Sequence, residues 1–210
     1  MTPKRGRPLP ITSDYFDDLH ASVVDYEGSK AILFCSNRTV EHILPMKLDT
    51  FLPLGEMDVF LYPLPSIKDK NDLKQIPRSL ERLTQTSYDS ETHPAITQAG
   101  DRVYQSNKSG IVNLYLKNAS TATEIALTNL PGNMHTYGLG EDGQGFIILF
   151  YKDQTYGLYQ FALNTADVKK PFDTNLASSK KNKRQSTGEA GSHLYRNSKS
   201  ILNFNHAIKT

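Results

Sequence analysis

The stretch GQGFIILFY at residues 143–151 combines a glycine turn with an uninterrupted run of apolar and aromatic residues. Residues 28–35, GSKAILFC, and residues 100–104, GDRVY, repeat this order of turn and apolar run. Short apolar runs bounded by turn residues are typical of buried β-strands. The one segment with a helix-like spacing, residues 71–83, contains Pro77, which would break a helix. The sequence therefore predicts an all-β chain built from an internal repeat.

The spacing of the copies indicates the size of the repeated unit. Gly100 and Gly143 lie 43 residues apart, and Gly28 lies 72 residues before Gly100. Units of about 40–45 residues with several strands are typical of β-propeller blades. The longer first copy is explained by insertions at about residues 39–54 and 66–79, which we expect to be surface loops. Each copy continues into a Leu-Tyr pair, and the first two end in Leu-Thr: Leu61-Tyr62, Leu114-Tyr115, Leu158-Tyr159, Leu83-Thr84 and Leu127-Thr128.

A further shared mark follows the first apolar run, as Ser36-Asn37-Arg38 in the first copy and Ser106-Asn107-Lys108 in the second. Together with the glycine turn, Leu-Tyr and Leu-Thr, this pattern resembles the TolB-type, WD-like propeller repeat, although the Ser-Pro-Asp-Gly turn usual in that family is degenerate here. Asn37 and Asn107 also begin glycosylation sequons, but a role in the repeated turn explains them first. The resemblance covers roughly Leu9–Phe172.

The resemblance implies a partial or small β-propeller with three recognisable blades and part of a fourth. It divides the chain into a basic N-terminal extension (residues 1–8), the blades (9–175) and a Ser/Lys-rich linker with a C-terminal segment (176–210). Closed propellers usually have about 4–8 blades. We therefore expect either a fragment of a larger protein or a small ring in which residues 9–13 join C-terminal strands near 192–205.

The resemblance is informative about fold and weak about function, because such blades serve both as binding platforms and as accessory domains of peptidases. No G-x-S-x-G nucleophile motif is present. We expect a non-enzymatic scaffold for protein–protein binding, extracytoplasmic or periplasmic by resemblance, with no signal peptide visible. The alternative is the accessory propeller of a peptidase or other hydrolase whose catalytic domain is absent from this chain.

The best candidate for a partner-binding surface is the insertion at residues 39–54, because it is a long segment rich in apolar side chains. Such a segment either packs on its own blade or binds a partner. The residues concerned are His42, Ile43, Leu44, Met46, Phe51 and Leu52.

No cofactor or metal is expected. His20, His93 and His135 recur near the start of each copy, and we favour structural hydrogen bonding over a metal-ligand role. The glycines of residues 138–143 match G-x-G-x-x-G, but a strand and not a helix follows, which favours turn glycines over a dinucleotide site. The single cysteine, Cys35, lies in an apolar run and is expected to be a buried, inert thiol.

Nucleic-acid binding through the basic termini is a second alternative. Residues 5–8, RGRP, match the core of an AT-hook, and residues 180–184, KKNKR, form a second basic run. The formal net charge is only +2, so no strong attraction to polyanions follows from the total, and we expect nucleic acid not to be a partner. No window has the ~20 apolar residues that a membrane-spanning helix needs.

Overall fold

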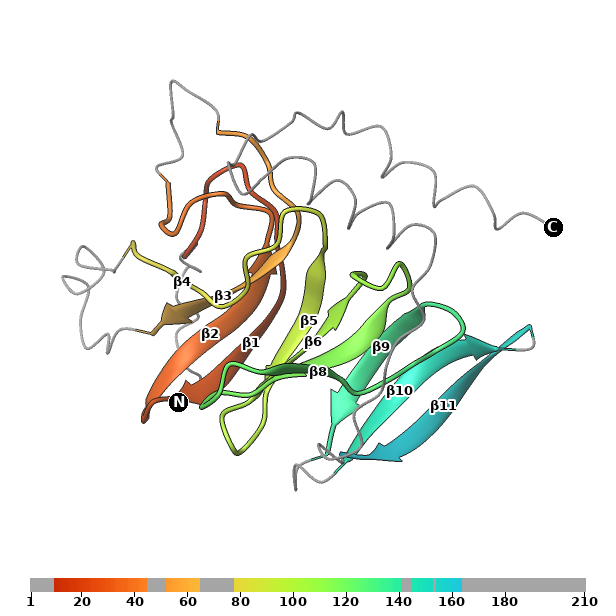
Figure 1. Cartoon of the computed structure of the whole chain (residues 1–210). Coiled ribbons are helices and arrows are strands. Elements are labelled where there is room, and N and C mark those ends of the chain that lie inside the picture. Colours follow the sequence, from red (N-terminus) through yellow and green to blue (C-terminus); the bar gives the residue numbers. More distant parts are fainter. Residues whose placement is uncertain (1–9, 45–51, 65–77, 141–144, 153, 164–210) are drawn as a thin grey trace, which may run out of the picture.

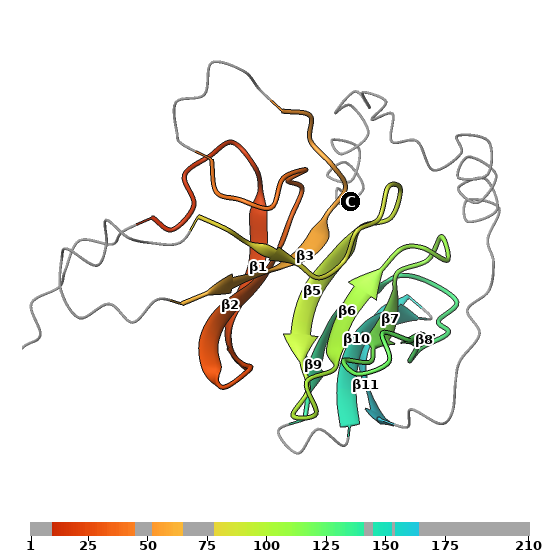
Figure 2. The same ribbon diagram turned by 60° about the vertical axis from the view of Figure 1, so that its left-hand side comes forward.

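The structure is a computed structural model. It describes residues 10–44, 52–64, 78–140, 145–152 and 154–163. Within these ranges the chain forms eleven β-strands and no helix, arranged as three antiparallel sheets. The prediction of an all-β chain is therefore confirmed for the described residues. Figures 1 and 2 show the three sheets following one another across the molecule in chain order, and they do not close into a ring.

The first sheet is a meander of four consecutive strands. Its order is β1 (Asp18–Tyr26), β2 (Ser29–Ser36), β3 (Asp58–Pro63) and β4 (Glu81–Arg82). The β1–β2 hairpin turns at Gly28, whose φ of 77° lies in the left-handed region that glycine tolerates best. The long apolar run expected as a buried strand is β2, which has strands on both sides.

The second sheet has the same order with shorter connections. It contains β5 (Glu91–Ile96), β6 (Arg102–Ser106), β7 (Asn113–Lys117) and β8 (Glu124–Ala126). Its first hairpin turns at Gly100, with a φ of 85°. The two sheets thus share both the turn and the strand order that the repeat predicted.

The third sheet has three described strands: β9 (Met134–Leu139), β10 (Gly145–Lys152) and β11 (Thr155–Ala162). The central strand is β10, so β11 lies at an edge of the described sheet. Residues 164–175, which complete the predicted blade region, lie outside the described residues. The first described residues, 10–17, form no strand, although residues 9–13 were expected to join C-terminal strands in a small ring.

The Leu-Thr marks have a shared structural role. In the first sheet, the Thr84 hydroxyl accepts a hydrogen bond from the third strand's backbone (2.8 Å) and donates to Asp58 Oδ1 (3.0 Å). In the second sheet, Thr128 accepts the equivalent backbone bond (2.9 Å) and donates to Asn113 Oδ1 (2.9 Å). In both copies, the threonine that follows the fourth strand is therefore hydrogen-bonded to the start of the third strand.

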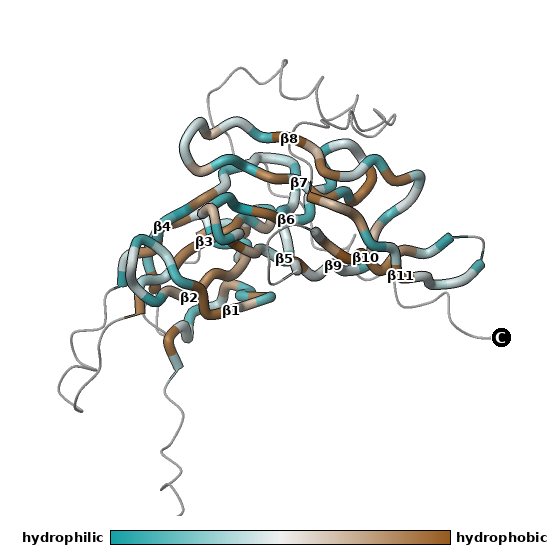
Figure 3. Tube along the Cα trace, turned by 90° about the horizontal axis from the view of Figure 1, so that it is seen from below, coloured by the Kyte–Doolittle hydropathy of each residue, from teal (hydrophilic) through white to brown (hydrophobic). Residues whose placement is uncertain are grey.

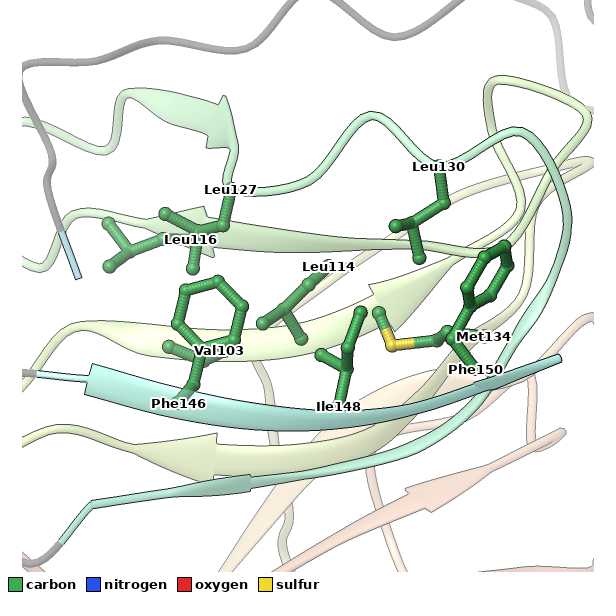
Figure 4. Packing of buried hydrophobic residues seen from close by; sticks show 9 residues of the cluster. All are labelled: Val103, Leu114, Leu116, Leu127, Leu130, Met134, Phe146, Ile148 and Phe150. Carbon is green, nitrogen blue, oxygen red and sulfur yellow. The ribbon is translucent and has the colours of Figure 1, made fainter. Parts of the chain in front are cut away.

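The apolar core lies between sheets, because each strand exposes alternate side chains to opposite faces. One cluster joins the first and second sheets through Leu33, Leu61 and Tyr104. A second joins the second and third sheets, and Figure 4 shows its side chains meeting between the two layers. Figure 3 shows apolar segments along β2, β3 and β10. The second cluster consists of Val103, Leu114, Leu116, Leu127, Leu130, Met134, Phe146, Ile148 and Phe150.

Candidate interaction surfaces

The insertion proposed from the sequence as a partner-binding segment is partly packed on its own sheet. Ile43 and Leu44 are 7% and 6% exposed. Ile43 belongs to a cluster with Phe34 and Phe60 on the face of the first sheet that points away from the second. Its backbone N–H donates to Arg78 O at 2.7 Å. Of the two alternatives for this segment, Ile43 and Leu44 therefore pack on their own sheet.

The remaining residues of that segment have different positions. His42 is exposed and forms an isolated β-bridge with Ser79. Leu52 is half-buried and its backbone N–H donates to the Tyr15 hydroxyl. Met46 and Phe51 lie outside the described residues. Partner binding by this segment stays a prediction.

A buried arginine holds the start of this segment in place. The Arg38 side chain has no exposed surface, and its guanidinium donates two hydrogen bonds to Asp18, at 2.7 and 2.8 Å. It also contacts Asp14 at 3.2 Å, and Asp14 Oδ2 accepts the backbone N–H of Leu44 at 3.1 Å. Charge-assisted bonds of this kind are about twice as strong as neutral ones. The Ser-Asn-Arg mark therefore has a structural role.

The asparagine of the same mark acts alike in both copies. Asn37 Oδ1 accepts the backbone N–H of Asp17 at 2.9 Å, and Asn107 Oδ1 accepts that of Ser90 at 3.0 Å. Each bond ties the end of the second strand to the approach of the first. Asn37 is also buried, at 8% exposed, which agrees with the predicted turn role.

In the second copy, the carboxylate equivalent to Asp18 is that of Glu91, which forms no ion pair with an arginine among the described residues. Glu91 pairs with Ser106 in the sheet as Asp18 pairs with Ser36, and its side chain accepts hydrogen bonds from Thr86 (2.8 Å) and Ser106 (3.0 Å). Burial and the nearby carboxylate of Asp58 raise the pKa of Glu91 to about 7. Asp58 is itself paired with Arg82, and burial raises its pKa.

Two of the repeated histidines meet at the boundary between the first and second sheets. His20 and His93 occupy β-bulges in β1 and β5 and have positive φ angles of 55° and 50°. Their rings stack with centroids 3.5 Å apart. Burial lowers the pKa of His20, and burial with the neighbouring histidines lowers that of His93 to about 4. His135 occupies the equivalent bulge of β9 and contacts the Tyr156 ring edge-on.

An open groove of about 320 Å³ runs along β1, β5 and β9, the first strands of the three sheets. The Tyr137 hydroxyl at its floor donates to His93 O (2.6 Å) and Val103 O (3.0 Å), which joins the second and third sheets. Within the described part of the chain, no group of three or more His, Cys, Asp or Glu side chains is placed to hold a metal ion. The lining residues are His20, Ala21, His93, Pro94, Ala95, Tyr137, Gly138 and Leu139.

Cys35 lies next to this groove. It is fully buried, and its thiol donates to Leu19 O and lies 3.3 Å from His20 Nδ1. Burial raises the pKa of the thiol to about 11, so the reactive thiolate is scarce at neutral pH. The predicted burial of the thiol is confirmed.

The third sheet carries an exposed apolar face. Side chains of β10 alternate between the core and solvent, so Ile147 and Tyr151 point away from the second sheet and are 47% and 51% exposed. On β11, Tyr156 lies opposite Tyr151 and Leu158 lies opposite Leu149, at 63% and 75% exposed, and Gln160 lies opposite Ile147. The Tyr151 and Tyr156 rings contact each other, with centroids 5.0 Å apart. We call Ile147, Leu149, Tyr151, Tyr156 and Leu158 the outer face of the third sheet.

This face was not singled out by sequence reasoning. The apolar run of β10 indicated a strand covered on both sides, and the described structure covers one side only. The sequence does contain a signal for this face. In the runs 145–152 and 155–162, which a tight hairpin joins, apolar side chains occur at both odd-numbered and even-numbered positions and therefore on both faces of the sheet.

The other sequence motifs do not form a site in the described structure. Of the G-x-G-x-x-G glycines, Gly140 directly follows β9 and Gly143 lies outside the described residues; the next described element is the strand β10 and not a helix that could bind a phosphate. Gly138 lies within β9 and does not have a positive φ, so the turn role expected for it is wrong. The basic runs at residues 5–8 and 180–184 lie outside the described residues.

No family model matches this chain, and a search of curated proteins finds no match. A search of the described residues for a helix that could cross a membrane finds none.

Proposed function

We propose that this chain is a non-enzymatic β-scaffold for protein–protein binding, built from blades of a TolB-type propeller. The repeat, the sheet order shared by the first two sheets and the threonine fastening of each fourth strand support the blade assignment. The observation that carries the function is the outer face of the third sheet.

That face differs from the equivalent surfaces of the other sheets. The second sheet is covered on both sides by its neighbours. The first sheet is covered by the second sheet and, on its other side, by the segment that contains Ile43. Among the described residues, the third sheet is covered only by the second. Contiguous apolar surface of this kind marks interaction sites on soluble proteins.

The chemistry of the face defines its partner. Its five named residues are apolar or phenolic, and Gln160, which lies opposite Ile147, is polar but uncharged. The two interfaces between sheets in this structure bury faces of the same composition. The partner is therefore a protein that presents an uncharged, apolar β-sheet face, because a charged surface would lose its hydration without gaining a counter-charge.

A photoactivated cross-linking residue at Ile147 tests this proposal in the host cell, with the same residue at Val23 as the matched control. Val23 lies on β1 and is 64% exposed, but it does not belong to the face. We expect an adduct with a second protein from position 147 and none from position 23. Equal adducts from both positions, or none from either, would contradict a binding role for the face.

A further inference from the structure

The edge strands of the three sheets differ in how they are protected against pairing with another chain. An exposed edge presents unpaired N–H and C=O groups, and natural proteins protect such edges with short strands, proline, charges or bulges. β4 and β8 have only two and three residues. β5 contains Pro94 and a bulge, and β1 contains a bulge and the charged Asp18 and Asp25.

β11 has none of these protections. Its eight residues, TYGLYQFA, contain no charge and no proline. All eight pair with β10 in an unbroken register, so no bulge twists the edge away. Most of its side chains are exposed, with Leu158 at 75%. In the described structure nothing covers its outer edge, because β11 ends the sheet order.

We propose that the outer edge of β11 pairs with β11 of a second copy of this chain, antiparallel and about a twofold axis. The pairing would join two three-stranded sheets into one continuous six-stranded sheet. Because the strand has no charged residue, the twofold pairing opposes no like charges. Aromatic side chains from Tyr156, Tyr159 and Phe161 lie along the seam in both copies, and aromatic cross-strand pairs stabilise antiparallel sheets.

The inference uses a different surface from the proposed function. The edge forms backbone hydrogen bonds in the plane of the sheet, whereas the outer face binds perpendicular to it. A twofold axis perpendicular to the sheet leaves both outer faces on the same side and open to a partner. Failure of one proposal therefore leaves the other intact.

The test is the mass of the full chain by sedimentation over about a hundredfold range of concentration. We expect the wild type to move from 23.6 kDa toward twice that mass as concentration rises. Leu158→Lys combined with Gln160→Lys places charges beside the seam and should raise the dissociation constant at least ~tenfold. Val23→Lys, at a position on β1 that is 64% exposed, should leave the dissociation constant unchanged, as should Ile147→Lys on the outer face.

Amide hydrogen exchange at β11 separates pairing between copies from other occupants. Protection of β11 that increases with concentration supports the proposal. A monomer at every concentration overturns it. If β11 is then protected at all concentrations, its edge is occupied by another segment of the same chain, and if it exchanges freely, the edge is open. A dimer that the double variant leaves unchanged also overturns the assignment to β11. Circular dichroism of each variant confirms that a loss of mass does not reflect unfolding.

Discussion

His20 and His93 stack face to face across the boundary between the first and second sheets, with ring centroids 3.5 Å apart. Each ring belongs to a bulge with a positive φ, so the backbone fixes where the ring points. Two neutral imidazoles tolerate this contact, and two imidazolium ions would repel each other at this distance. Protonation of both histidines at low pH should therefore weaken the contact between the first and second sheets.

We predict that this boundary loses stability between about pH 6.5 and pH 4. The pKa of His93 is lowered to about 4 in the folded chain, and that of His20 is also lowered. A histidine with a lowered folded-state pKa binds its proton more readily when unfolded. The contribution of the histidine to folding stability is therefore fully present above pH 6.5 and is lost as the pH falls toward its pKa in the folded chain.

The double variant His20→Asn with His93→Asn tests this, because asparagine tolerates a positive φ better than most residues. Thermal unfolding followed from pH 7 to pH 4 should show a smaller drop in Tm for the variant than for the wild type. Equal drops in both proteins would show that other groups cause the acid sensitivity.

A second prediction concerns Glu91, whose pH dependence has the opposite sign. Its pKa is raised to about 7 in the folded chain by burial and by Asp58. The folded state therefore favours the protonated carboxyl group. This preference stabilises the folded chain at low pH, and the stabilisation is lost as the pH rises from about 4.5 to 7. Glu91→Gln should raise the free energy of unfolding by about 1–3 kcal/mol at pH 8 and leave it nearly unchanged at pH 4.

Urea unfolding of both proteins at the two pH values measures the difference. Ser90→Ala, at the neighbouring position, is a control that keeps the carboxyl group. A Glu91→Gln variant that is less stable at pH 8 would show that the buried carboxylate is ionised and held by its hydrogen bonds.

A third prediction separates the buried arginine from an exposed ion pair in the same sheet. Arg38→Ala leaves Asp14 and Asp18 without their counter-charge, and removing one partner of a buried pair costs about 3–5 kcal/mol. Lys30→Ala removes an ion pair with Asp25 in which both side chains are mostly exposed, and such pairs contribute about 0–1 kcal/mol. Chemical denaturation of the two variants gives both values. Comparable losses would contradict the role assigned to Arg38.

Arg38→Ala should also release the segment that carries Ile43 and Leu44, because Asp14 bonds both the guanidinium and the Leu44 backbone. Amide exchange at Leu44 should then increase more than exchange in β7, which lies in the next sheet. Unchanged exchange at Leu44 would show that the apolar contacts of Ile43 hold the segment without the arginine.

Local sequence patterns predicted the strands well, because apolar runs and turn residues can be recognised from residues adjacent in the sequence. The apolar runs at residues 31–35 and 146–151 lie within β2 and β10, and the turns at Gly28 and Gly100 occur where expected. The Leu-Tyr pairs show the limit of the method. Leu61 lies three residues after the start of β3, whereas Leu114 lies one residue after the start of β7. These two positions differ by two residues, so each leucine lies on the same side of its strand. The sequence pattern therefore looked regular, although the Leu-Tyr pairs occupy different positions in their strands.

The candidate surfaces were harder to predict, because they depend on contacts between distant residues. Arg38 bonds to Asp14 and Asp18, which lie 24 and 20 residues before it, and nothing in the local pattern identifies these partners. The stacking of His20 on His93 depends on two bulges in different sheets. The outer face of the third sheet is visible only once the sheet that covers the opposite side of β10 is known.

The last prediction compares the two faces of the third sheet. Ile148 has no exposed surface and packs between the second and third sheets with Leu114 and Met134 (Figure 4). Ile148→Ala should destabilise the chain by about 2–5 kcal/mol, because it removes buried methyl groups and leaves a cavity. Leu158→Ala lies on the outer face, where 75% of the residue is exposed, and should change the free energy of unfolding by less than about 0.5 kcal/mol at dilute concentration. Urea unfolding of both variants checks the difference. A large loss from Leu158→Ala in the dilute monomer would mean that another part of the same chain already covers the outer face, and the partner proposed for it would then have no surface to bind.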